Sequence, residues 1–396
     1  MRVTYITFIV TLLATTVAGH ARTTLFQKSD SVVFIGNTFV DLLREHGHLE
    51  TILTARHPDH ELRFRNLGWA GDTLRVQARP FNFTPLDAEL AARKADVIVA
   101  SFGMGESFAG ADGVDSFKAD LLKLIEHLSS KNFNGETPPR IVLISPIACE
   151  DQGPVATPNH KTVRANLGLY ARAMGEVAKQ KNVTFVDVFT PTAKRLKTTK
   201  KKMTVNGIHF NDSGYRFVSR VIADALTQPD PWRVEVDAAA KGSRAVNTKI
   251  SQVKVADDAV TFHVHDSTLP LQGERRSLVA KHLRPGTYTL IIDGTPVASF
   301  DHARWQRGVA VVNNPAGVQV EQLRSAINDK NKRFFYRWRA LNSVHIVGQR
   351  KSSPSGKDLP GELKKMDVNI KEKEKAIPPL AKPPISQVWK LVRSGD

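Results

Sequence analysis

Four short stretches of this sequence carry hydroxyl, imidazole, amide and glycine groups of the kind that acyl-transfer chemistry uses. A hydroxyl nucleophile needs a base, and it needs N–H donors for the negative charge that develops on the attacked oxygen. Thr38 supplies a hydroxyl and His209 an imidazole. The four stretches are Gly36-Asn37-Thr38, Asn66-Leu67-Gly68-Trp69-Ala70-Gly71-Asp72, Gly103-Met104-Gly105-Glu106 and Asn206-Gly207-Ile208-His209.

The first stretch is predicted to form a tight turn from a strand to a helix. An apolar strand precedes it at Val32–Gly36, and apolar residues recur at helical spacing from Phe39 onward. Gly36 permits a sharp backbone path. Thr38 then falls at a helix N-terminus, where free N–H groups and the helix dipole favour negative charge. The alternative interpretation is that Thr38 only caps the helix.

Strands and helices alternate from Ser31 to about Gln228, which predicts a parallel sheet with helices on both faces. Ligands of such sheets bind beyond the carboxyl ends of the strands. Thr38, Gly68, Gly103 and Gly105 all follow such ends. The predicted strands are Val32–Gly36, Leu62–Asn66, Asp96–Phe102, Ile141–Ser145 and Thr184–Val188.

The pattern changes after Pro229-Asp230-Pro231, where short alternating strands and turn residues predict a small antiparallel β domain with one helix over residues 318–332. A basic aromatic cluster follows at residues 333–339. It either stacks sugars or bases or packs a sheet edge with arginine stems over the rings, and we favour the second interpretation. The expected divisions are 1–21, 30–229, 232–350 and a charged, Pro-rich tail over 351–396.

The chain has 396 residues, a length that suggests two or three domains. Its formal charge of +17 suggests an anionic partner such as a glycan or a cell-envelope surface. No nucleic-acid-binding signature accompanies the charge, so nucleic acid is not expected. Residues 1–21 are typical of a secretory signal, with a membrane anchor as the alternative, and predict a secreted or periplasmic protein. The single cysteine, Cys149, rules out an intrachain disulfide.

The four stretches resemble, in order and spacing, the blocks of the SGNH, or GDSL-like, hydrolases. The resemblance covers roughly the first 230 residues. It implies an α/β fold, a three-layer α/β/α flavodoxin-like sandwich of five parallel strands, to which the sequence adds a small C-terminal β-rich domain. It also implies hydrolysis of acyl or acetyl esters on a glycan or lipid. No cofactor is expected.

Carried over residue by residue, the resemblance makes Thr38 the nucleophile in place of a serine and His209 the base. Gly68 takes the place of the oxyanion-hole glycine. Gly105 stands where the family has an asparagine donor, and Asn206 stands where it has the carboxylate partner of the histidine. Losing an oxyanion donor typically costs about 10²–10³ in rate. The Asp→Asn change costs about 10⁴ in the serine protease template.

Two acidic residues near the expected mouth, Glu106 and Asp72, have open roles. Each either orients His209, binds a cation or is a solvated carboxylate. The remaining histidines show no convincing metal-ligand spacing, so no metal site is predicted. His46, His48, His57 and His60 are expected at the surface.

Two functions follow from these residues. The first is a secreted esterase that uses a Thr38–His209 dyad. The alternative is a catalytically inactive protein of the same fold that binds envelope polysaccharide, because serine, asparagine and aspartate are all replaced. A weaker third interpretation is an extracellular scaffold whose region from Trp232 onward docks a neighbouring protein.

Overall fold

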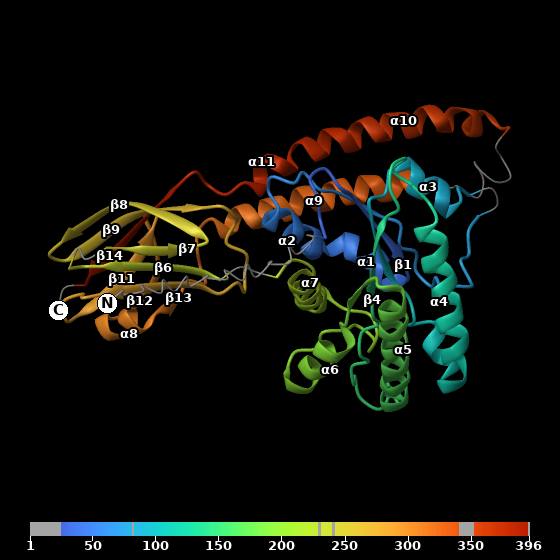
Figure 1. Ribbon diagram of the computed structural model, residues 1–396, viewed down its shortest axis with the longest axis horizontal. Helices are drawn as coiled ribbons and strands as arrows, with labels where there is room; N and C mark the ends of the chain where they lie inside the picture. Colours follow the sequence, from blue (N-terminus) through green and yellow to red (C-terminus); the bar gives the residue numbers. More distant parts are fainter. Residues whose placement is uncertain (1–24, 81–82, 229–230, 240–241, 340–351, 395–396) are drawn as a thin grey trace, which may run out of the picture.

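The computed structural model describes residues 25–80, 83–228, 231–239, 242–339 and 352–394. The molecule is elongated, with an α/β unit at one end, a β-rich unit at the other, and helix α9 running from one to the other (Figure 1). The expected signal sequence, residues 1–21, lies outside the described residues. Within them, no helix combines the length and the apolar character needed to cross a bilayer.

The α/β unit is built on a sheet of five parallel strands in the order β2-β1-β3-β4-β5. This confirms the predicted fold class. The central strands are almost wholly buried, because helices cover both faces and leave no wet side. The strands are β1 (Ser31–Gly36), β2 (Arg63–Asn66), β3 (Val97–Ser101), β4 (Arg140–Ile144) and β5 (Thr184–Val186).

Two apolar cores, one on each face of the sheet, hold the three layers together. Alternate strand residues divide between them: Val32 and Phe34 face one core, and Val33 and Ile35 face the other. The first core takes its helical residues mainly from α1 (Thr38–His46), α2 (His48–Arg56), α6 (Phe189–Thr198) and α7 (Asp212–Thr227). The second takes them mainly from α3 (Leu86–Ala92), α4 (Val114–Ser129) and α5 (His160–Lys181), with the short turns η1 (Glu106–Ala109) and η2 (Ala111–Gly113) nearby.

The β-rich unit consists of two sheets, with strand orders β13-β10-β6-β7 and β12-β11-β14-β9-β8. Strands β6 and β10 run parallel, so the unit is not wholly antiparallel as expected. Trp232, Trp305 and Trp389 are buried in its core. Its elements, apart from β14, are β6 (Trp232–Asp237), β7 (Arg244–Val246), β8 (Thr248–Ala256), β9 (Ala259–Asp266), β10 (Arg276–Lys281), β11 (Thr287–Ile292), β12 (Thr295–Asp301), α8 (His302–Arg307) and β13 (Val309–Ala310).

Strand β14 (Gln387–Arg393) lies in the middle of the five-stranded sheet, between β11 and β9. The structure differs here from the expected Pro-rich tail. Gln387, Trp389 and Leu391 are buried, while Val388 and Lys390 are exposed. This period-two alternation is typical of a strand with one core-facing side.

Three helices after the β13 strand return the chain to the α/β unit: α9 (Gly317–Trp338), α10 (Pro354–Lys375) and α11 (Ile377–Ala381). Leu323 and Ile327 of α9 join the core beneath α1 and α2, and Phe334 and Trp338 join the other core. Helix α10 packs along α9 (Figure 1). Therefore α9, expected within the β-rich domain, is structurally part of the α/β unit. The basic aromatic cluster forms its last turns rather than a sheet edge.

Candidate active site

The turn that carries Thr38 follows the carboxyl end of β1. Gly36 has φ +139°, and a Cβ there would lie 2.2 Å from the Ser101 carbonyl oxygen, so only glycine fits. The cap of α1 is Asn37, whose side-chain oxygen accepts the Phe39 N–H at 3.0 Å. Thr38 is the first residue of the helix, and no described residue accepts its backbone N–H. The capping role is therefore filled by Asn37, and the Thr38 N–H is left for a ligand.

The hydroxyl of Thr38 meets a backbone donor from the second stretch. The Gly71 N–H donates to Thr38 Oγ1 at 3.2 Å, and Gly71 is exposed. Its φ of +84° lies in the left-handed region that favours glycine. The Gly71 N–H thus lies beside the hydroxyl, next to the helix N-terminus at which the Thr38 N–H has no acceptor among the described residues.

Gly68, the predicted oxyanion donor, is engaged elsewhere. Its N–H donates to Asn66 Oδ1 at 2.8 Å, and Asn66 Nδ2 donates to the Val40 carbonyl at 2.7 Å. These buried bonds fasten the stretch to α1. The Gly68 N–H therefore already has an acceptor within the protein. The signal in the sequence is Asn66 itself, because such residues commonly bond the backbone N–H two positions on.

Asn206 and His209 are in direct contact. Asn206 Oδ1 accepts the backbone N–H groups of His209 at 2.9 Å and Ile208 at 3.3 Å, which fixes the orientation of the amide. Asn206 Nδ2 consequently faces His209 Nδ1 at 3.0 Å. An amide NH₂ can only donate, so Nδ1 must accept and the neutral ring carries its proton on Nε2.

This tautomer is the reverse of the one that a general base needs. In the serine hydrolase template a carboxylate holds the Nδ1–H and leaves Nε2 free to take a proton. Burial lowers the pKa of His209 below its ordinary value, so the ring is neutral at pH 7. Asn206 thus orients the imidazole but selects the proton position that opposes base catalysis.

The Thr38 turn and the His209 loop meet at the same edge of the sheet. The rings of Phe39 and Phe210, which follow Thr38 and His209 respectively, lie 6.5 Å apart in an edge-to-face arrangement. The His209 loop is tied to the segment after β4, because the Glu150 N–H donates to the Gly207 carbonyl at 2.7 Å. Among the described residues, no hydrogen bond joins Thr38 to His209.

The buried carboxylate of Glu150 also fixes the His209 loop. It accepts the backbone N–H of Thr204 at 2.8 Å and the Thr204 hydroxyl at 2.6 Å, and it is 4% exposed. This carboxylate therefore anchors the loop and does not face the histidine as a catalytic partner.

Glu106 holds two stretches together. Its Oε2 accepts the Gly103 N–H at 2.8 Å, and its Oε1 accepts the Leu74 N–H at 2.9 Å. It does not bond His209. Gly105 beside it offers no side-chain donor, and a Cβ there would lie 2.8 Å from the Thr73 methyl group. The third stretch therefore contributes positioning rather than a side chain that replaces the family's asparagine.

Asp72 is also committed to a structural pair. Arg79 binds its two carboxylate oxygens at 2.8 and 2.6 Å and lies 4.3 Å from the Trp69 ring centre. The guanidinium group of Arg339, at the end of α9, lies 4.1 Å from the centre of the same Trp69 ring. Arg339 also donates a hydrogen bond to the Gly68 carbonyl at 2.6 Å. Arg339 was not predicted as a site residue. It comes from a helix more than 250 residues further along the chain.

One group of described side chains has the composition of a metal site. His46 Nδ1 and His48 Nε2 lie 3.2 and 2.9 Å from Asp212 Oδ1, and all three ligand atoms lie within 4.8 Å of one another. Arg216 binds the other oxygen of Asp212, and burial lowers the pKa of His48. His48 is buried rather than at the surface as expected. The group fastens the α1–α2 turn to α7, and the neighbouring guanidinium opposes a divalent cation.

The sequence model of the GDSL-like Lipase/Acylhydrolase family matches residues 35–217. No curated protein matches the chain. Among solved structures, BT4096, a gut microbial diltiazem-metabolizing enzyme, is similar at a TM-score of 0.70 and 16% identity, covering 93% of this chain and 98% of that one. Axe2, an acetylxylan esterase from Geobacillus stearothermophilus, covers 52% of this chain and 97% of its own, at a TM-score of 0.42 and 19% identity. The likeness to BT4096 extends over both units of the fold.

Proposed function

Because residues 35–217 belong to the GDSL-like lipase/acylhydrolase family, we propose that the protein is an acyl-ester hydrolase whose nucleophile is Thr38. The observation that carries this proposal is the contact between the Gly71 N–H and the Thr38 hydroxyl at 3.2 Å. A donor that meets the attacking oxygen also lies within reach of the carbonyl oxygen that this hydroxyl would attack. Gly71, rather than Gly68, is therefore the proposed oxyanion donor.

In the proposed reaction the Thr38 oxygen attacks the ester carbonyl while His209 Nε2 takes the hydroxyl proton. The Gly71 and Thr38 N–H groups stabilise the oxyanion, and the histidine then protonates the departing alcohol. Water releases the acyl group by the same steps. His209 and Asn206 are thus proposed as base and positioning residue, respectively.

We expect turnover to be slow. The base must carry its proton on Nδ1, where Asn206 Nδ2 would then face another N–H. The threonine methyl group also crowds the attack. Gly105 has no side chain that could donate a hydrogen bond to the oxyanion. The Glu106 carboxylate accepts the backbone N–H groups of Gly103 and Leu74 and supplies no donor either.

The test is hydrolysis of p-nitrophenyl acetate by the full chain and by Thr38→Ala. We expect Thr38→Ala to fall to the background rate, because no other hydroxyl meets the Gly71 donor among the described residues. Thr190→Ala, an exposed threonine of α6, is the matched control and should keep the wild-type rate. Equal rates for Thr38→Ala and the wild type would remove the proposal.

The second candidate function is recognition of an acylated glycan without hydrolysis. The donor that Asn206 presents to His209 Nδ1 favours it, because that donor blocks the base tautomer. A glycan that binds equally to the wild type and Thr38→Ala, with no acyl release by either, would support this function over the first.

The natural substrate is proposed to be an ester on a glycan or a lipid outside the cytoplasm. The support is the signal-like pattern of residues 1–21 and the formal charge of +17, which suits an anionic surface. Fractionation of the producing cells, with sequencing of the mature N-terminus, would test this location. A protein that retains Met1 in the cytoplasm would contradict it.

A further inference from the structure

A cavity lies at the opposite edge of the parallel sheet from Thr38. It has a volume of about 390 Å³ and is enclosed by the first residues of β1 and β2, the turn after α3, and helices α9 and α10. Ser31 and Arg63 begin the strands whose far ends lead to Thr38 and Gly68. The two sites are therefore separated by the length of the strands. The volume is within the range of small-ligand pockets.

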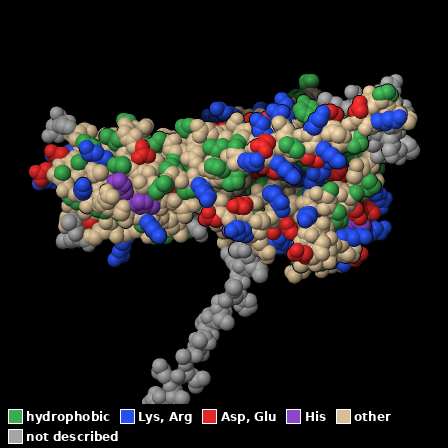
Figure 2. Space-filling model, turned by 90° about the horizontal axis from the view of Figure 1, so that it is seen from above, with side chains coloured by type: hydrophobic (Ala, Val, Ile, Leu, Met, Phe, Trp, Pro, Cys, Tyr) green, Lys and Arg blue, Asp and Glu red, His purple; other side chains and the backbone are tan. Residues whose placement is uncertain are grey.

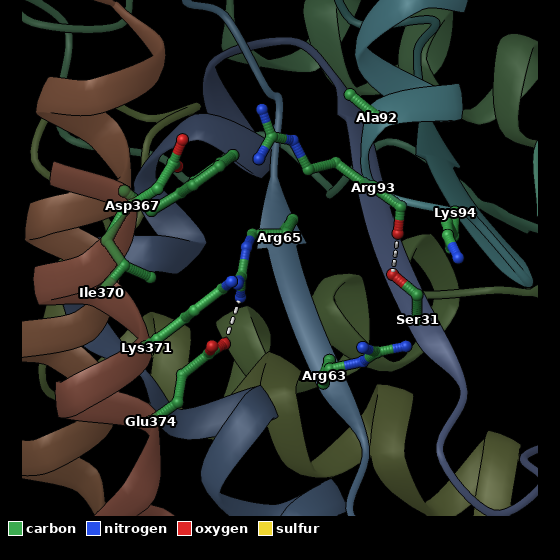
Figure 3. Close-up of a pocket in the computed structure, with 11 residues that line it drawn as sticks. Ser31, Arg63, Arg65, Ala92, Arg93, Lys94, Asp367, Ile370, Lys371 and Glu374 are labelled. Atoms are coloured by element: carbon green, nitrogen blue, oxygen red, sulfur yellow. Dashed lines mark hydrogen bonds and ion pairs between the residues drawn. The ribbon is translucent and has the colours of Figure 1, made fainter. Parts of the chain in front are cut away.

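Cationic side chains dominate this cavity. Figure 3 shows Arg65, Arg93 and Lys371 approaching it from β2, the turn after α3 and α10, respectively. Arg63 and Lys94 complete the cationic set, against two lining carboxylates, Asp367 and Glu374. On the face of the molecule that carries α10, Lys and Arg side chains gather over the same half (Figure 2).

Both carboxylates of the cavity are already neutralised. Glu374 binds Arg65 at 2.5 Å, and Asp367 binds Arg337 at 2.8 Å through one oxygen and 3.1 Å through the other. They therefore cannot balance the remaining cations of the cavity.

Those remaining cations lack protein anions. Lys94 and Lys371 are exposed, and neither ammonium group has a partner in the described ranges. Among the described residues, the Arg63 side chain donates to the Ser29 carbonyl alone, at 3.3 Å. Gathering unpaired cations around one cavity is unfavourable unless an anion enters it.

Arg93 gives an independent indication of a ligand. Its side chain is 13% exposed, and only its Nη2 meets a carboxylate, that of Glu89 at 3.1 Å. Its Nε is buried without a hydrogen-bond partner. Such a buried donor costs free energy unless a ligand or an ordered water meets it.

The cavity also offers apolar contacts. The Phe334 ring lies between two guanidinium groups, 5.2 Å from that of Arg65 and 5.3 Å from that of Arg93. Ile370 also lines the cavity, but Phe334 and Ile370 are each only 2% exposed, so they lie beneath its surface. The apolar surface open to an occupant is that of the exposed Ala92 and of the aliphatic stems of the lining side chains.

We propose that this cavity binds a small organic anion, in which a phosphate, sulfate or carboxylate group faces the cations and a compact body lies against Ala92 and the aliphatic stems of the lining side chains. Guanidinium groups bind all three oxyanions through paired N–H donors. The site is independent of Thr38 and of the proposed esterase activity.

Calorimetric titration of the full chain at low salt tests the proposal. The probes are glucose 6-phosphate, glucose 6-sulfate, glucuronate and inorganic phosphate, with glucose as the neutral control. We expect saturable one-to-one binding of at least one organic anion, tighter than that of inorganic phosphate, and no binding of glucose. The ranking of the three anions identifies the oxyanion that the site prefers.

The variants are Lys94→Gln and Lys371→Gln, which remove exposed charges without breaking any described contact. Each should weaken binding by about three- to tenfold. Lys197→Gln, an exposed lysine of α6, is the matched control and should bind as the wild type. Binding that is absent, that is equal for glucose or for inorganic phosphate, or that survives both cavity variants unchanged would overturn the proposal. Whether or not the protein hydrolyses p-nitrophenyl acetate, the result of this anion-binding titration stands on its own.

Discussion

At the scale of single residues, Asn206 fixes the contact that the His209 ring makes at Nδ1. Its oxygen is held by two backbone N–H groups, and its NH₂ therefore meets the histidine ring. An aspartate in the same position would keep both backbone bonds. Its second oxygen would accept the Nδ1–H and leave Nε2 free as a base.

We predict that Asn206→Asp raises kcat/KM for p-nitrophenyl acetate by about 10² or more, given the cost of about 10⁴ for the reverse change in the template. The measurement is initial rate against substrate concentration. Asn159→Asp, an exposed asparagine before α5 whose side chain makes no cap bond, should leave the rate unaltered. A rate in Asn206→Asp that equals that of the wild type would mean that the tautomer does not limit the chemistry.

We also predict that an asparagine at position 105 improves the oxyanion site once space is made for it. A Cβ at Gly105 meets the Thr73 methyl group, which Thr73→Ser removes. The double variant Thr73→Ser/Gly105→Asn should show about tenfold higher kcat with little change in KM. Thr73→Ser alone is its control. An increase in both variants alike would assign the effect to Thr73.

His57 predicts a pH dependence of stability. Burial, together with His60 and Arg56, lowers its pKa to about 4, and its Nε2 is buried without a partner. Above pH 6.5 both folded and unfolded forms are neutral. Between pH 6.5 and about 4 only the unfolded form takes up the proton, so stability falls as the pH falls through this window.

The check is the melting temperature from pH 7.5 to 4. His57→Leu should flatten the decline, whereas His263→Leu, a half-buried histidine of β9, should keep the wild-type slope. Equal slopes for His57→Leu and the wild type would contradict the assignment.

At this scale the sequence predicted the residue types of the site but not their partners. Block order and spacing indicate Thr38, His209 and Asn206, whose roles stay a prediction. Block spacing does not indicate Gly71, the donor proposed here in place of Gly68, because two glycines share one stretch and only the bonded Asn66 distinguishes their N–H groups.

At the scale of elements, the last turn of α9 supports the proposed oxyanion donor. Arg339 donates to the Gly68 carbonyl and pairs with Asp41 at 3.1 Å. With Arg79 it also contacts the Trp69 ring. These contacts fix the stretch in which Gly71 lies.

Arg339→Met should therefore lower kcat/KM by about tenfold and the free energy of unfolding by about 1–3 kcal/mol. Kinetics and denaturant unfolding measure the two effects. Arg333→Met, an exposed arginine on the same helix, should change neither markedly. Full activity in Arg339→Met would show that Gly71 holds its place without α9.

The five parallel strands were predictable because buried strands are continuously apolar. Strand β14 was not predicted, because the lysines and prolines before it have the composition of a tail. The alternation of Gln387, Trp389 and Leu391 with Val388 and Lys390 was the available signal. The break between α1 and α2 at Gly47 was also missed.

At the scale of the whole molecule, the two units are interlocked along the chain. The path leaves the α/β unit after α7, builds most of the β-rich unit, and returns as α9 to both cores of the α/β unit. The local composition indicates the boundary between the two units at residues 229–231. It does not indicate that α9 packs back on the α/β unit, because a contact between residues far apart in the chain cannot be read from local composition.

We predict that residues 25–228 alone aggregate, because removal of α9 exposes the apolar surface that Leu323, Ile327, Phe334 and Trp338 cover. Co-expression with residues 231–394 should restore soluble protein. Size-exclusion chromatography and the melting temperature provide the measurement. A soluble, monomeric fragment with the stability of the full chain would show that α9 is dispensable.

The central place of β14 has a consequence for biosynthesis. Every other strand of its sheet leaves the ribosome earlier, yet β11 and β9 have no hydrogen-bonding neighbour between them until Gln387–Arg393 emerges. A nascent chain therefore presents two unpaired strand borders from the completion of β11 at Ile292 until β14 begins at Gln387. We expect a chain that ends before Gln387 to keep both borders exposed and therefore to be prone to aggregation through strand pairing.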